Sequence, residues 1–316
     1  MSTGHHIRNH ASPHIRYLKR TDIDIPRWDA CISRAPDGLI YGRSFFLDAM
    51  TGGRWDGLVL DDYSAVMPLT WKKKFGIAYL YQPHYCAALG IFGQIPHRIH
   101  SDFLTAIPRR IRFWDIDLQE NNSSISSTAL PLKKTMRRNY FLPLDMAYDA
   151  IAAKYRRLAR RMLLKAASAQ LSVERDVDPG LVIENYRKSY GHLQLSGLRQ
   201  LSDCASKALA EGHAATYLAK GPDREIVGFY LVFSDDRFVY SVLGGSTGKG
   251  KEEGAFYLLT DAVIRDHCSS GRIFRFEGSD LPGIAFFNAQ FGPYPVLYPH
   301  LVLNRLPFPF SRLKPG

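Results

Sequence analysis

The pattern closest to a ligand-binding motif is the glycine-rich segment 244–254, which reads GGSTGKGKEEG. Glycines let backbone N–H groups approach a phosphate, and a following helix adds the positive end of its dipole. Lys249 and Lys251 would add positive charge. A solvated surface loop explains the same residues equally well. On the first interpretation, the residues that bind an anionic donor are Gly244, Gly245, Ser246, Gly248, Lys249, Gly250 and Gly254.

Glu277 is the carboxylate that we predict to be catalytic. It closes a strand-like run over 272–278 and precedes Gly278, so it would stand at the end of a strand. A carboxylate there can accept the proton of an attacking amine. Asp115 and Asp117 occupy the corresponding place in the first half of the chain. An ion pair or a turn-capping carboxylate is the competing interpretation.

Tyrosines and arginines supply the candidate substrate contacts. Tyrosines cluster after a strand-like run at 77–81, where they would line an apolar pocket with polar groups, although core tyrosines would look the same. A basic helix over 148–169 carries arginines at i, i+4 spacing, which suits bidentate phosphate contacts or a solvated face. The predicted substrate-binding residues are Tyr79, Tyr81, Tyr85, Arg157, Arg160, Tyr240 and Ser279.

Several kinds of site are excluded or unsupported by the motifs. The G-K-[ST] of a P-loop does not occur, and no serine has the G-x-S-x-G context. The four cysteines, Cys31, Cys86, Cys204 and Cys268, are far apart and form no CxxC, so we expect neither a disulfide framework nor a metal site. Reduced thiols fit a reducing compartment.

Composition sets the broad class. The 316 residues are 46% hydrophobic and 22% charged, with a net charge of +11, which is typical of a globular chain of about two domains. The N-terminus lacks the apolar region of a signal peptide, and no apolar run is long enough to span a bilayer. We therefore expect a cytoplasmic protein without a transmembrane segment. The charge favours anionic partners, such as CoA, tRNA or phospholipid headgroups, without choosing among them. No DNA-binding module is present.

The order of elements repeats along the chain. Strand-like runs at 55–60, 64–71 and 77–81 lead through a loop and a helix to a strand at 110–118; runs at 215–220, 225–234 and 237–243 lead to a helix over 254–268 and a strand at 272–278. A weak repeat of this size predicts two similar α+β units. We place a flexible arm at 1–13, the first unit at 14–145 and the second, with the donor loop, at 146–316.

Three segments resemble the FemAB-like branch of the GNAT acyltransferase superfamily. They are the basic helix KYRRLARRMLLKA at 154–166, YSVLGGS at 240–246 with the helix after it, and FEGS at 276–279 followed by GIA and FG. The resemblance covers roughly residues 39–303. It implies tandem GNAT-like units with mixed, largely antiparallel sheets flanked by helices. The phosphate loop of the CoA-dependent members, Q/R-x-x-G-x-G/A, is not matched cleanly here, and the long helical hairpin of some Fem ligases is absent.

The resemblance also implies a function. Members move an acyl or aminoacyl group from CoA or aminoacyl-tRNA to an amine, so the expected activity is that of an N-acyltransferase with acyl-CoA as a co-substrate and no permanently bound cofactor. The acceptor would be a small-molecule or peptide amine, or a lipid-linked cell-wall precursor. The alternative is a non-catalytic GNAT-fold protein that holds an anionic ligand in a basic cleft.

Overall fold

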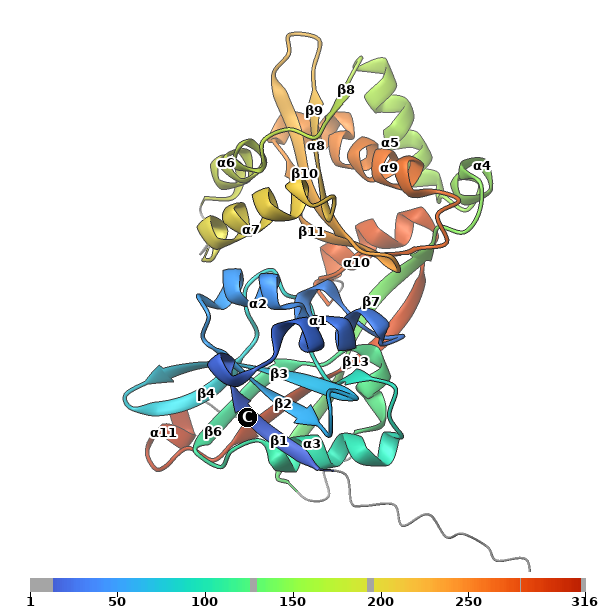
Figure 1. Cartoon of the computed structure of the whole chain (residues 1–316). Helices are drawn as coiled ribbons and strands as arrows, with labels where there is room; N and C mark the ends of the chain where they lie inside the picture. The colour runs from blue at the N-terminus through green and yellow to red at the C-terminus, as the bar shows by residue number, and fades with distance from the viewer. Residues whose placement is uncertain (1–13, 126–129, 192–195, 279, 314–316) are drawn as a thin grey trace, which may run out of the picture.

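A computed structural model describes residues 14–125, 130–191, 196–278 and 280–313. Ser279, one of the predicted substrate-binding residues, therefore lies outside the described residues, as does the arm expected at 1–13. Within them, the strands form a 13-stranded mixed sheet in the order β1-β2-β3-β4-β6-β13-β7-β12-β11-β10-β9-β8, with β5 paired to β3 (Figure 1). The strands are β1 (Ile15–Lys19), β2 (Trp55–Leu60), β3 (Ala65–Lys74), β4 (Ile77–Tyr81), β5 (Phe92–Gly93), β6 (Ile111–Asp117), β7 (Leu132–Pro143), β8 (Ser172–Arg175), β9 (Ala214–Lys220), β10 (Ile226–Ser234), β11 (Phe238–Ser246), β12 (Ile273–Arg275) and β13 (Tyr294–Asn304).

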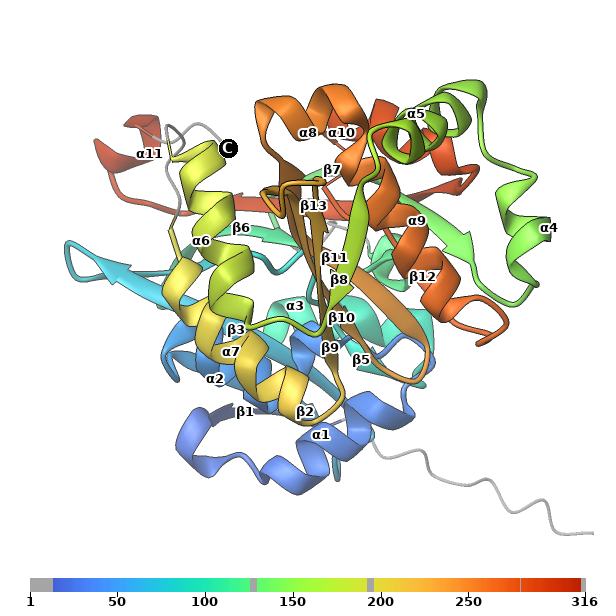
Figure 2. The same ribbon diagram turned by 90° about the horizontal axis from the view of Figure 1, so that it is seen from above.

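Helices cover the sheet on both faces. In the second half, Figure 2 shows α6 and α7 on one side of β9–β11, and α5 and α9 on the other. The α-helices are α1 (Ile25–Arg34), α2 (Ser44–Thr51), α3 (His100–Ala106), α4 (Tyr148–Ala152), α5 (Arg157–Ser168), α6 (Pro179–Tyr190), α7 (Leu198–Ala210), α8 (Gly248–Glu253), α9 (Ala255–His267), α10 (Pro282–Asn288) and α11 (Phe310–Leu313). Short 3-10 turns are η1 (Arg20–Asp22), η2 (Ile40–Gly42), η3 (His97–Ile99), η4 (Glu120–Ser124) and η5 (Ala289–Phe291).

The predicted repeat is present in the topology. In the first half, β2, β3 and β4 are antiparallel neighbours, and β6 returns parallel to β4. In the second half, β9, β10 and β11 are antiparallel neighbours, and β12 returns parallel to β11. A helix lies between the parallel strands each time, as a parallel connection requires. The tandem, largely antiparallel α+β fold is thus confirmed.

The two halves share strands at the centre of the sheet. β13, near the C-terminus, lies between β6 and β7 and is antiparallel to both. β7 in turn pairs with β12 of the second half. The predicted boundary at residue 145 follows β7 directly. The sheet continues across that boundary, because β7 of the first half pairs with β12 of the second.

Three clusters of buried side chains form the core. One, around Ile116 and Leu301, fills the outer face of the first half. A second, around Leu259 and Phe291, lies beneath α5 and α9. The third contains Tyr41 from the first half and residues of α7 and β11, so it joins the two halves.

The prediction of one helix over 148–169 is wrong in one respect, because this segment forms two helices, α4 and α5. The chain turns at Tyr155, which is buried and donates its hydroxyl to Asp261 at 3.0 Å. The backbone N–H of Arg156 bonds to the carbonyl of Gln290 at 2.8 Å instead of continuing a helix. Tertiary contacts therefore override a sequence with strong helical propensity.

Four smaller predictions are corrected by the structure. Residues 244–246 extend β11 and 248–250 begin α8, so 244–250 is not a loop. Lys72–Lys74 belong to β3, and only Phe75 and Gly76 form the turn. The sequence favours Ser44 as the N-cap of α2, but its hydroxyl donates to Asp29 at 2.5 Å and caps nothing. The prolines at 307 and 309 predict a loop at the tail, whereas residues 310–313 form α11.

Candidate functional site

Polar side chains cross four neighbouring strands on one face of the central sheet. Their strands are β6, β13, β7 and β12, and the register places His300 opposite Asp117 and Tyr298 opposite Arg137. Because alternate side chains of a strand share a face, these groups line up across the sheet. We call the set the polar row; it consists of Asp115, Asp117, Arg137, Asn139, Arg275, Glu277, Tyr298 and His300.

Asp117 is the centre of the row's first group. Its carboxylate accepts from both sides: Arg137 Nη1 lies 2.8 Å away and His300 Nδ1 lies 3.0 Å away. Arg137 also approaches Asp280 at 3.3 Å, and His300 Nε2 lies 3.7 Å from Asp115. This half of the row therefore alternates carboxylates with basic groups, which is an arrangement able to hold a proton or a charged ligand group.

Glu277 is the centre of the second group. Its Oε1 lies 3.1 Å from Nε of Arg275, whose Nη1 reaches Glu120 at 2.8 Å. The Asn139 amide donates to the other oxygen of Glu277 and accepts from the Glu277 backbone N–H at 2.9 Å. The guanidinium of Arg275 also lies 5.2 Å from the centre of the Phe238 ring. Charge-assisted bonds thus fix the Glu277 carboxylate in one orientation.

Burial controls protonation in this group. It raises the pKa of the Glu277 carboxyl, and the positive charge of Arg275 opposes that effect in part. Burial also raises the pKa of Tyr298, aided by the nearby carboxylates of Asp117 and Asp280. The phenol of Tyr298 therefore keeps its proton at neutral pH, and the Glu277 carboxyl takes up a proton more readily than an exposed one.

The sheet opens beside Glu277. β11 and β12 pair through Tyr240 and Arg275, where β12 ends, but β11 continues to Ser246. The chain turns away at Glu277, which has a φ of 55°. Among the described strands, none pairs with this edge of β11 beyond Tyr240. An unpaired strand edge can form backbone hydrogen bonds with an extended ligand.

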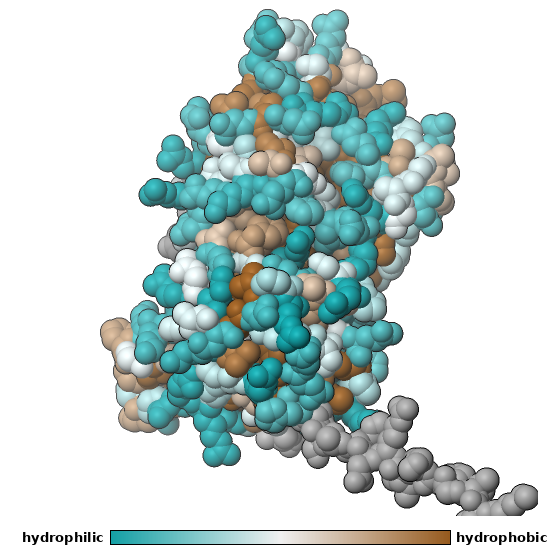
Figure 3. All heavy atoms as spheres, in the orientation of Figure 1, coloured by the Kyte–Doolittle hydropathy of each residue, from teal (hydrophilic) through white to brown (hydrophobic). Residues whose placement is uncertain are grey.

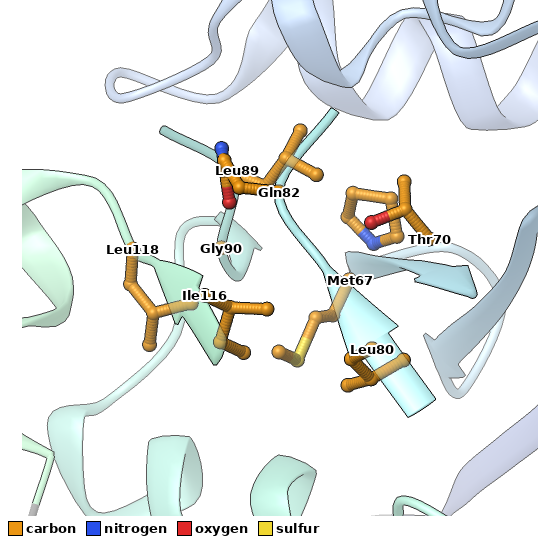
Figure 4. Close-up of a pocket in the computed structure, with 9 residues that line it drawn as sticks. Met67, Thr70, Leu80, Gln82, Leu89, Gly90, Ile116 and Leu118 are labelled. Atoms are coloured by element: carbon orange, nitrogen blue, oxygen red, sulfur yellow. The ribbon is translucent and has the colours of Figure 1, made fainter. Parts of the chain in front are cut away.

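The corresponding place in the first half is closed. Where β4 and β6 would diverge, Leu89 forms a bridge to Leu118, and Met67, Gln82 and Ile116 fill the space (Figure 4). The remaining cavity is about 10 Å³, which is about enough for one water molecule. The space between these strands is thus filled in the first half, whereas no described strand pairs with this edge of β11 beyond Tyr240 in the second.

The predicted donor-binding glycines lie together, but most are needed for packing. A Cβ at Gly244 would lie 2.5 Å from the ring of Phe256, and one at Gly245 would lie 2.6 Å from Tyr190. Gly250 would similarly clash with the carbonyl of Val227, and Gly254 with that of Met162. Among the predicted donor-binding glycines, Gly248 is the one at which an added Cβ would have no atom within 4 Å.

Two further predicted donor residues already have partners. Lys249 forms an ion pair with Glu225. Ser246 bonds through its backbone to the Tyr190 hydroxyl at 3.4 Å. Thr247 caps α8 by accepting from the N–H of Gly250 at 3.1 Å. Whether this turn also binds a donor stays a prediction.

The predicted substrate contacts divide among several places. Tyr240 is buried where the two halves meet, and its hydroxyl accepts from the Ile40 N–H at 3.2 Å. Tyr81 pairs with Asp115 in register, beside the polar row. Tyr79 contacts Tyr81 edge to face, with ring centres 6.4 Å apart. Tyr85 packs against the core cluster that joins the halves.

The predicted arginines do not reach Glu277. Arg157 and Arg160 lie on α5, which packs against α9 through the cluster that contains Phe274 and Phe276. Glu277 and Arg275 point to the opposite face of the sheet, because their positions alternate with those two phenylalanines. The basic helix and the polar row are thus on different sides of the second half.

Most of the polar row was missed from the sequence. Arg137 and Asn139 lie on β7, Arg275 on β12 and His300 on β13, and only the pairing of β12 and β13 with β7 brings these distant segments together. Alternating polar residues in apolar strands were the one available signal. In the part of the chain that the structure describes, no group of three acidic, histidine or cysteine side chains is arranged to hold a metal ion. None of the described helices has the length and apolar character to cross a bilayer.

Solved structures share this architecture. FemX aligns with a TM-score of 0.65 and 13% identity over 94% of this chain and 99% of its own. L-PGS from Bacillus licheniformis aligns with a TM-score of 0.54 and 11% identity, over 84% and 90% of the two chains. A tandem GNAT protein from the clavulanic acid biosynthesis pathway gives 0.53 and 13%, over 94% and 99%. The chain therefore has the tandem GNAT-like fold of FemX. No protein-family model and no curated protein sequence matches it.

Proposed function

We propose that the protein is an N-acyltransferase that moves an acyl or aminoacyl group from an activated ester or thioester to an amine. The observation that carries the proposal is the opening between β11 and β12, with Glu277 at its mouth. The donor would lie extended along the free edge of β11. Its carbonyl would then stand between the two halves of the chain, where the polar row faces.

The chemistry needs one proton acceptor and good positioning. The amine nitrogen attacks the acyl carbon and loses a proton, the bond from that carbon to sulfur or oxygen breaks, and the leaving group takes up a proton to become a free thiol or alcohol. Glu277 would take that proton, since Arg275 and Asn139 hold it still and burial raises its pKa. Fixed geometry supplies much of the remaining rate enhancement in reactions of this type.

Acyl-CoA and aminoacyl-tRNA are the donors that we propose. Both are polyanions, which suits the net charge of +11. The three similar structures are named FemX, L-PGS and a tandem GNAT protein, and these names support a transfer reaction of this class. Gly248 and Lys249 at the start of α8 would bind the donor phosphates. A cytoplasmic location follows from these donors, and the four cysteines are all free thiols.

A non-catalytic binding protein is the second candidate, and one observation favours it. Glu277 is already paired with Arg275 and bonded to Asn139, and Lys249 is paired with Glu225. A protein that only holds an anionic ligand would use the polar row for binding and would not need Glu277 as a base.

A thermal-shift titration tests the donor first. CoA, acetyl-CoA and a longer acyl-CoA are compared with ATP as the control for charge. A ligand at 100 times its Kd stabilises the native state by about 2.7 kcal/mol. We expect the CoA species to raise the melting temperature and ATP to leave it unchanged. Equal shifts with all ligands, or no shift, would contradict CoA as the donor and leave aminoacyl-tRNA as the remaining candidate.

Turnover separates the enzyme from the binding protein. With the donor identified, transfer to a panel of amines is measured for the native protein, for Glu277→Gln and for Glu211→Gln, which changes an exposed carboxylate at the end of α7. Loss of a general base lowers the rate by about 10²–10⁴-fold. We expect that loss for Glu277→Gln alone. Donor binding without any turnover in the native protein would support the binding role.

A further inference from the structure

A cavity lies at the far end of the first half, beside the polar row. It measures about 360 Å³ and is bounded by the β3–β4 hairpin and the C-terminal segment that contains α11. The volume falls within the usual range for small-ligand pockets, about 300–1,000 Å³. Its wall is mostly apolar and includes Phe75, Ile77, Tyr79, Phe113, Leu306 and Phe310.

Two aromatic side chains stand exposed at this end. Phe75 is 78% exposed in the hairpin turn, and its ring stacks on that of Phe310, with centres 6.1 Å apart. Phe308, two residues earlier, is 73% exposed. Figure 3 shows apolar colours at the left edge of the lower half, where Figure 1 places the hairpin and α11. A large apolar surface beside a pocket marks an interaction site.

The backbone at Phe75 argues against an accidental exposure. Its φ is 50°, in the left-handed region that glycine and asparagine adopt most easily. This backbone conformation is unfavourable for phenylalanine. Outside the turn, its ring contacts that of Phe310.

Basic residues far outnumber acidic ones around the pocket. The three segments that form it, 71–79, 109–115 and 304–313, contain eight lysines and arginines and one acidic residue, Asp115. None of the eight forms an ion pair within the described residues. Instead, Lys74 and Arg312 lie against the rings of Phe75 and Phe308, at 5.6 and 5.5 Å. Eight basic residues spread over this surface are more than a ligand with a single carboxylate or phosphate group would need.

We infer that this end of the protein docks on an anionic membrane surface, with one acyl chain of a phospholipid entering the pocket. Phe75 and Phe308 would enter the interfacial region, and the lysines and arginines would bind the headgroups. Aromatic rings and basic side chains together are typical of proteins that lie on a membrane. The inference is independent of any acyl transfer.

Docking here also orients the polar row. Phe113 in the pocket wall and Asp115 of the row lie on the same face of β6, two residues apart. That spacing is about 7 Å along a strand. The face that carries the row is thus continuous with the face that would meet the membrane.

Flotation with vesicles tests the docking. The full-length protein is mixed with vesicles of phosphatidylcholine, with or without phosphatidylglycerol, at low and at high salt. We expect binding to the anionic vesicles only, weakened by salt because exposed charges are screened. Equal binding to both kinds of vesicle, or no binding to either, overturns the inference.

Variants locate the surface. The double change Phe75→Ser, Phe308→Ser should weaken binding at least about tenfold, since it removes two aromatic rings that would be buried in the membrane. Lys73→Gln with Lys74→Gln should do so by about tenfold or more at low salt. Leu164→Ser is the matched control, because Leu164 is 71% exposed on the basic helix α5. Loss of binding in the control but not in the phenylalanine variant would overturn the assignment.

A soluble ligand is the competing occupant, and a separate measurement distinguishes it. Dodecanoate below its micelle concentration is titrated by calorimetry into the native protein and into Ile77→Trp, which fills the pocket. Docking predicts vesicle binding that Ile77→Trp weakens. Tight binding of dodecanoate without vesicle binding would contradict docking. Circular dichroism of each variant checks that these exposed or half-buried changes leave the fold intact.

Discussion

Arg275 holds a full positive charge where only 2% of the residue is exposed. Its partners are Glu277 at 3.1 Å and Glu120 at 2.8 Å, and burial of those carboxylates without it would be costly. We therefore expect Arg275→Met to lower the free energy of unfolding by about 3–5 kcal/mol. Urea denaturation measures it. Arg272→Met, which changes a half-buried arginine three residues earlier, is the control; equal losses would show that the buried network contributes little.

The raised pKa of Glu277 has a consequence for stability. Because its pKa is higher in the folded state, the stability it contributes is present below the ordinary glutamate pKa, about 4.3, and is lost as pH rises through the folded value. Glu277→Gln does not titrate. Native stability minus variant stability should thus fall as the pH rises across this window.

Urea denaturation at a series of pH values gives that difference. The exposed Glu211→Gln should show no such trend, since it leaves the buried network untouched. A difference that grows with pH for Glu277→Gln would mean that Arg275, and not burial, controls the pKa of this carboxyl.

At the scale of elements, the connection between α8 and α9 depends on one glycine. Gly254 has a φ of 82°, and a Cβ there would lie 2.4 Å from the carbonyl of Met162 in α5. Gly254→Ala should destabilise the protein by at least about 1–2 kcal/mol, since a left-handed conformation and a clash add. Gly248→Ala is the matched control, because nothing lies within 4 Å of its Cβ. It should be neutral or stabilise by about 0.4–1 kcal/mol. Thermal unfolding compares the two, and similar melting temperatures would contradict the packing role.

The elements that the sequence predicted best are those fixed by local signals. The ranges 55–60 and 77–81 match β2 and β4 residue for residue, because glycine and charged turns bound short apolar runs. The helix over 148–169 failed because Tyr155 turns into the core. Likewise, Glu277 could be singled out from its place at a strand end, whereas its partner Asn139 is 138 residues away. Such pairings depend on register, which no local pattern encodes.

The whole molecule depends on one strand near its C-terminus. β13 lies between β6 and β7, and its residues pair with ten positions of β7, from Leu132 to Phe141. Without it, β6 and β7 would each expose an unpaired edge. The first half, 14–145, therefore lacks a strand at the centre of its sheet.

We expect a fragment of residues 14–145 to fail to fold alone, although its length would suffice for a domain. It should give no cooperative thermal transition by circular dichroism, whereas co-expression with 146–316 should restore a complex that melts cooperatively. The control is the fragment 14–145 joined by a flexible linker to 294–313, which returns β13 to its place between β6 and β7. Recovery of a transition in that fragment would assign the defect to the missing strand. A sharp transition in 14–145 by itself would instead mean that the first half is an independent folding unit, and that β13 joins two preformed domains.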